Sequence, residues 1–201
     1  MIRLYSLMPD RLNLNGDQAN LLILQKRLAW QGAQAEIVPI CSPDDMREAL
    51  AFASQNPKET FVLIGHGSVA AMRTLEPWTA EVRFWIDQLI NLGCSGLAVG
   101  SGFELLLDDV QRKERVSEFA VAQLREGVQG LGYVNSDADL PLIEVVGAGF
   151  VRTLLHGPIL AKNPHLADWF LKRMGVSVKQ NDRTKEIDAI VAKVWELEAN
   201  H

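Results

Sequence analysis

One histidine stands where a strand is expected to end. His156 follows the apolar run 150–155, which predicts a buried strand, and it precedes Gly157 and Pro158. The carboxyl ends of the strands in a parallel sheet are the usual place for a ligand. A histidine there is suited to act as a general base or to pair with a thiol. The alternative is a histidine that only hydrogen-bonds a loop, and the residue taken alone favours this alternative.

A second segment has the pattern of a sharp turn between a strand and a helix. Gly100-Ser101-Gly102 follows the apolar run 96–99. Small neighbours allow such a turn to expose one side chain, as in a nucleophile elbow. Ser101 is the candidate nucleophile, although the segment lacks the G-x-S-x-G pattern of hydrolases. A tight turn without a catalytic residue is the favoured interpretation.

A glycine-rich loop follows the apolar run 61–64. Gly65, His66, Gly67 and Ser68 could present backbone N–H groups to an anion or an oxyanion. No Lys-Ser/Thr pair of the phosphate-loop type follows, so a nucleotide is not predicted.

The two cysteines indicate neither a metal site nor a disulfide framework. Cys41 and Cys94 do not have the spacing of metal ligands. Cys94 precedes the strand 96–99 rather than following it, so we expect an inert thiol of the core or of a loop. The sequence gives no reason to expect a metal or another cofactor.

Composition limits the classes of function. The 201 residues, 48% hydrophobic and 22% charged, predict one globular domain spanning 1–201. The formal net charge of −5 argues against nonspecific nucleic-acid binding. No apolar stretch approaches the roughly 18 residues of a membrane span, and the first residues lack a signal-peptide core. We therefore expect a cytoplasmic protein.

Apolar runs alternate with amphipathic segments, which predicts an α/β fold with a mainly parallel sheet. Asp17 is expected to cap the first helix, and Ser42 the second. The segment 118–126 could be a helix or a strand. Strands are predicted at 2–7, 35–40, 61–64, 96–99, 130–134, 142–146 and 150–155, and helices at 17–31, from 43, at 78–92, from 163 and at 183–198.

Three segments together resemble the cobyric-acid-synthase-like branch of class I glutamine amidotransferases, in particular the glutaminase subunit of lipid II isoglutaminyl synthase. Residues 7–20, leading into 24–28, are similar to the opening strand, turn and helix of that family. Residues 154–164, extending to 168, are similar to the segment of its catalytic histidine, and 64–68 to its oxyanion loop. The resemblance covers most of 1–107 and 145–175.

The resemblance implies a three-layer, flavodoxin-like sandwich and a glutaminase that passes ammonia to a synthetase. The family needs a cysteine at the elbow, but Gly100 occupies that place, and Glu104 replaces a glutamine. Its glutamine-binding arginine loop has a counterpart at 133–139 that lacks the arginine. Glycine cannot form a thioester. The resemblance retains His156 and assigns Gly65, His66, Gly67 and Glu104 to substrate binding.

Two hypotheses follow from this comparison. The first is a degenerate amidotransferase without glutaminase activity, which binds or regulates an ATP-dependent synthetase resembling the Mur ligases. The second is an active amidotransferase or hydrolase subunit in peptidoglycan or cobalamin-type amidation, which uses Ser101 or a water molecule together with His156.

Overall fold

The main sheet is mixed and mainly parallel, as predicted. The computed structural model describes residues 1–124 and 127–198. Five parallel strands lie side by side, and a sixth is antiparallel at the edge. This order is that of a flavodoxin-like sheet with an added edge strand. The spatial order is β2 (Ala35–Ile40), β1 (Ile2–Leu7), β3 (Thr60–Ile64), β4 (Ser95–Val99), β8 (Phe150–Thr153) and β7 (Ile143–Val146).

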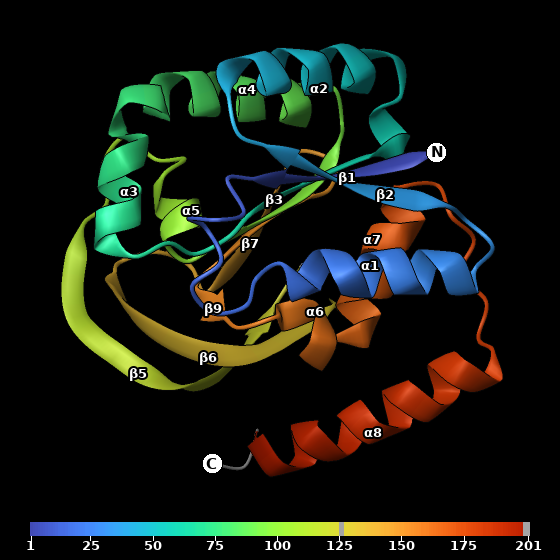
Figure 1. Cartoon of the computed structure of the whole chain (residues 1–201). Coiled ribbons are helices and arrows are strands. Elements are labelled where there is room, and N and C mark those ends of the chain that lie inside the picture. The colour runs from blue at the N-terminus through green and yellow to red at the C-terminus, as the bar shows by residue number, and fades with distance from the viewer. Residues whose placement is uncertain (125–126, 199–201) are drawn as a thin grey trace.

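Helices cover both faces of this sheet and complete a three-layer α/β sandwich (Figure 1). One face buries the apolar sides of α1 (Ala19–Trp30) and α7 (Pro164–Arg173). The other buries those of α2 (Pro43–Gln55) and α4 (Thr79–Asn91). The shorter elements are α3 (Val69–Leu75), α5 (Ser101–Glu104), α6 (Ile159–Lys162) and the 3-10 turns η1 (Pro57–Glu59) and η2 (Glu76–Trp78).

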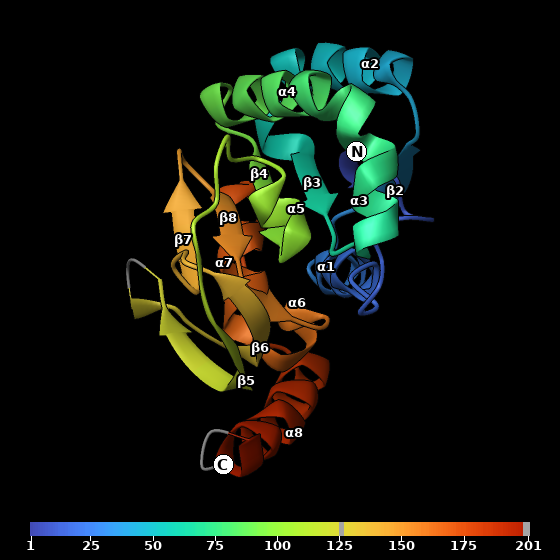
Figure 2. The same cartoon turned by 90° about the vertical axis from the view of Figure 1, so that its left-hand side faces the viewer.

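A second, antiparallel sheet lies beside the first (Figure 2). It consists of β5 (Arg112–Gln123), β6 (Gln129–Ala138) and β9 (Leu155–His156). The ambiguous segment 118–126 is therefore a strand as far as Gln123, and residues 125–126 lie outside the described part of the chain.

The predicted strand 150–155 is wrong at its end. The chain leaves the main sheet after Thr153, whose hydroxyl accepts a hydrogen bond from the Leu155 N–H at 3.0 Å. Leu155 and His156 then pair with β6. His156 consequently belongs to the second sheet, and not to the end of a strand of the first.

The two predicted helix caps have different outcomes. The Ser42 side chain caps α2 by accepting the Asp45 N–H at 3.2 Å, as predicted. The prediction for Asp17 is wrong, because α1 begins without a side-chain cap. The Asp17 carboxylate instead accepts the backbone N–H of His66 at 2.9 Å. A carboxylate that follows β1 thus supports the loop that follows β3.

The C-terminal helix α8 (Asp182–Glu198) lies outside the sandwich (Figures 1 and 2). The buried guanidinium of Arg27 joins it to the body, since Arg27 pairs with Asp168 of α7 at 2.8 Å and with Asp188 of α8 at 3.0 Å. The Trp195 indole N–H also donates to the Lys162 carbonyl oxygen at 2.6 Å. Polar contacts therefore hold much of α8 in place.

Asp188→Asn should lower the free energy of unfolding by about 1 kcal/mol, because it weakens a partly buried ion pair. The rate of backbone amide hydrogen exchange should increase in α8 more than in the other helices. Urea unfolding measures the first effect and exchange mass spectrometry the second. Asp139→Asn is the matched control: its pair with Lys113 is more exposed, so the change should stay within about 0.5 kcal/mol. Equal losses in both variants would contradict the role given to Asp188.

Candidate functional site

The three segments predicted to share one edge of the sheet meet there. The Gly100 N–H donates to the Thr153 carbonyl oxygen at 2.8 Å, which joins the ends of β4 and β8. The next residue, Ser101, donates its backbone N–H to Nδ1 of His66 at 3.0 Å. The rings of His66 and His156 lie edge to face, with centroids 4.5 Å apart. The predicted convergence of the loop, the elbow and His156 is confirmed.

Gly100 has the backbone of a sharp turn between a strand and a helix. Its φ of 54° and ψ of −118° lie in a region that side chains disfavour. A Cβ atom there would lie 2.4 Å from Cε1 of His156 and 2.5 Å from Nδ1 of His66. The two imidazoles thus fill the space that a side chain at the elbow would need.

Hydrogen bonds fix the protonation of both rings. His66 accepts the Ser101 N–H at Nδ1. His156 faces the side-chain NH₂ group of Asn15 through its own Nδ1, at 3.1 Å. An amide nitrogen can only donate, so this Nδ1 accepts as well. In the neutral state both imidazoles carry the proton on Nε2, and the lone pair of each Nδ1 is engaged.

Burial keeps both histidines neutral. It lowers the pKa of His156 to about 4, and the neighbouring His66 acts in the same direction. Burial also lowers the pKa of His66. Protonation of either ring would place a cation against the other in a site that water reaches poorly. At neutral pH the pair is therefore uncharged.

The Ser101 hydroxyl is hydrogen-bonded to the glycine-rich loop. It accepts the Gly67 N–H at 2.9 Å and can donate to the Gly67 carbonyl oxygen at 3.1 Å. Within residues 1–124 and 127–198 it makes no hydrogen bond to His156. The first glycine of the loop, Gly65, packs so closely that a Cβ atom would lie 2.0 Å from the Leu12 carbonyl oxygen. The loop is thus closed against its neighbours, and the Gly67 N–H is already used.

Glu104 is held by an arginine of the second sheet. Arg112 pairs with Glu104 at 2.6 Å and with Asp137 at 2.9 Å. Of the segment 133–139, which resembles the glutamine-binding loop of the amidotransferases, residues 133–138 form part of the regular strand β6. Arg112 therefore forms ion pairs with carboxylates of the chain itself.

Asn15 and Asp17 complete the site and were not predicted as members. The Asp17 side chain is fully buried, and its Oδ1 has no hydrogen-bond partner. Burial raises the pKa of Asp17 to about 6, and the hydrogen bond from the His66 N–H opposes this shift. No sequence signal links Asn15 to His156, because 141 positions separate them.

Cysteines and possible metal ligands were the remaining candidates for a chemical centre. Cys94 is buried in the core, and burial raises its pKa to about 11. Across the described ranges, no three or more His, Cys, Asp or Glu side chains are grouped so that they could hold a metal ion.

Comparisons with known proteins leave the family resemblance as a prediction. No protein-family model matches the chain, and no curated protein matches it at a significant level. Among the described residues, no helix combines the length and the apolar character needed to cross a membrane.

Proposed function

We propose that this chain is a cytoplasmic, non-catalytic protein of the glutamine-amidotransferase type, which binds or regulates a Mur-ligase-like ATP-dependent synthetase. The observation that carries the proposal is the filled elbow. Gly100 has no side chain, and the imidazoles of His66 and His156 occupy the space where a nucleophile would begin. This arrangement can stabilise the fold but offers no group to attack an amide.

The other parts of a glutaminase are also engaged internally. The N–H after the nucleophile is the usual oxyanion donor at an elbow. Here that N–H belongs to Ser101 and binds His66. The Nδ1 lone pair of His156 faces Asn15 and is not free to accept a proton from a substrate. The Ser101 hydroxyl binds Gly67, which gives the hydrolase hypothesis no support.

A group of exposed apolar side chains beside the site supports the binding role. Phe119, Val121 and Tyr133 are 39%, 45% and 37% exposed on the second sheet. Phe119 pairs with Tyr133 across β5 and β6, with ring centroids 5.3 Å apart. Exposed aromatic groups of this kind are enriched at protein interfaces. The same β6 strand pairs with His156, so this surface adjoins the former catalytic centre.

The purified protein should release no ammonia from glutamine, alone or with a ligase present. A thiol-directed glutamine analogue and a serine-directed fluorophosphonate should both leave its intact mass unchanged. Coupled ammonia detection and mass spectrometry measure these outcomes. A turnover that survives metal removal and disappears in His156→Ala would overturn the proposal.

Co-expression with a Mur-ligase-like protein should give one complex in size-exclusion chromatography. Val121→Glu should weaken that complex at least tenfold, because it places a charge in the proposed interface. Val69→Glu is the matched control, since Val69 is 72% exposed on α3, an element of the main body. Two separate peaks at micromolar concentration, or equal effects of both variants, would count against this partner surface.

A further inference from the structure

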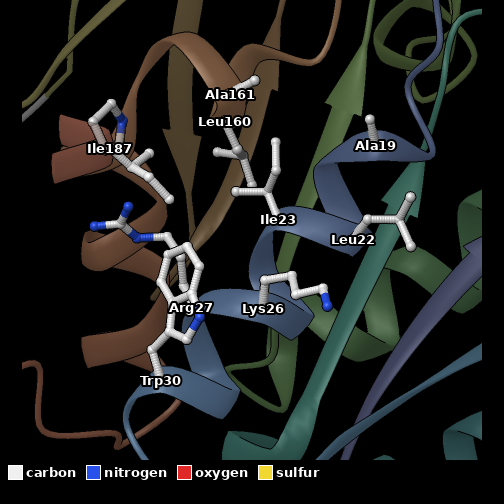
Figure 3. A pocket seen from close by; sticks show the side chains of 10 residues that line it. Ala19, Leu22, Ile23, Lys26, Arg27, Trp30, Leu160, Ala161 and Ile187 are labelled. Carbon is white, nitrogen blue, oxygen red and sulfur yellow. The ribbon is translucent and has the colours of Figure 1, made fainter. Parts of the chain in front are cut away.

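A hollow of about 300 Å³ lies between α1, the segment containing α6 and the start of α7, and the outlying helix α8. Figure 3 shows Ile187 and Trp30 on one side of it and Lys26 and Leu22 on the other. Eight of its ten lining residues are apolar: Ala19, Leu22, Ile23, Trp30, Leu160, Ala161, Pro164 and Ile187. The site lies apart from the histidine pair and is independent of the function proposed above.

The two charged residues of the lining differ in whether they have an ion-pair partner. The Arg27 guanidinium pairs with two carboxylates, those of Asp168 and Asp188, so these three side chains together carry one negative charge. Lys26 is exposed and has no hydrogen-bond or ion-pair partner among the described residues. No carboxylate lines the hollow. Lys26 is thus the lining cation without a partner among the described residues, and it stands beside an apolar wall.

Polar contacts attach α8 beside the hollow. The side chain of Asn181 donates to the Trp30 carbonyl oxygen at 3.3 Å, and Asp188 pairs with Arg27. Ile187, which lies between these anchors, remains 37% exposed, and Leu22 across the hollow is also exposed. An apolar group that entered here would cover both side chains and remove apolar surface from water.

We propose that this hollow binds a small amphipathic carboxylate, with its alkyl chain or ring against Ile23, Trp30 and Ile187 and its carboxylate on the Lys26 ammonium. The volume is at the lower end for small-molecule sites and matches a short chain or a single ring. Both nearby carboxylates are held by Arg27, so the Lys26 ammonium is the charged group left to pair with a ligand, and it favours an anion.

Octanoate, octanol and octyltrimethylammonium are the probes. Calorimetry should give saturable binding of octanoate to the full chain. The Trp30 indole N–H signal, assigned with Trp30→Phe, should shift in proton–nitrogen spectra. Lys26→Gln should weaken octanoate about fivefold, the range of an exposed ion pair, and leave octanol unchanged. Lys58→Gln, on η1, is the matched control and should change neither affinity.

A second variant tests the location. Ala161 lines the hollow from an exposed position on α6, so Ala161→Phe should fill it without disturbing the core and abolish binding of octanoate and octanol. Undiminished binding to Ala161→Phe would overturn the proposed site. Octyltrimethylammonium that binds as tightly as octanoate, or Lys26→Gln without effect, would overturn the selection for a carboxylate. Absence of saturable octanoate binding would overturn the proposal as a whole.

Discussion

Gly100→Ala should lower the free energy of unfolding by about 3–5 kcal/mol, the sum of backbone strain and overpacking. The new Cβ atom would lie 2.4 Å from His156 and 2.5 Å from His66, so at least one imidazole must move. Gly32→Ala is the matched control. Gly32 also has a positive φ, of 78°, but no atom lies within 4 Å of its Cβ position. That variant should cost only about 1 kcal/mol. Urea unfolding compares them, and equal losses would mean that the imidazoles do not restrict position 100.

Removal of one ring should relieve part of the cost. In a double-mutant cycle, His66→Ala and Gly100→Ala should couple favourably by about 1–2 kcal/mol. Gly100→Cys should meet the same obstacle and release ammonia from glutamine poorly, because the thiol would lack both space and a binding loop for the substrate. Turnover close to that of an intact glutaminase would show that the pocket is still complete.

Asp17 and His156 should give stability opposite dependences on pH. The folded-state pKa of Asp17 is raised to about 6, so its contribution is fully present below its ordinary pKa and is lost as the pH rises through 6. Relative to Asp17→Asn, the wild-type protein should lose about 1.5 kcal/mol between pH 5 and pH 8. Thermal or urea unfolding of both proteins across this range measures the difference. A constant difference would mean that the Asp17 carboxyl titrates normally.

The histidine should act with the opposite sign. Its folded-state pKa is lowered to about 4, so its contribution is present above pH 6.5 and is lost as the pH falls toward 4. Relative to His156→Gln, the wild-type protein should lose about 2 kcal/mol between pH 8 and pH 5. Urea unfolding of both proteins across this range measures the difference, and a constant difference would contradict the lowered pKa of His156.

The main sheet could be predicted from the sequence because its strands are continuous apolar runs. The central runs, such as Phe61–Ile64, are buried on both faces between helices, whereas the edge strands β2 and β7 are only partly buried. The ends of β3 and β4 also indicated two of the segments that meet at the site, the loop 65–68 and the elbow 100–102. Such patterns are local, and the physics that produces them acts within a few residues.

The second sheet and the interior of the site depend on contacts between distant positions. β9 has two residues, too few for any periodicity, and its partner Tyr133 lies more than twenty positions earlier. The sequence predicted a role for the backbone N–H groups of the loop at Gly65. In the structure, the side chain of His66 in this loop fills the space at the elbow together with His156. Asp17 reaches the His66 N–H because β1 and β3 are neighbours, and Asn15 meets His156, which the second sheet holds.

The division of the chain after Thr153 has a mechanical consequence. His66 and Gly100 are carried by the parallel sheet, whereas His156 is carried by the antiparallel one. A rotation of the β5–β6 arm would therefore slide one imidazole along the edge of the other and strain the contact with Asn15. The geometry of the histidine pair therefore depends on the angle between the two sheets. The chemical shifts of the ring protons of His66 and His156 should change with that angle in solution.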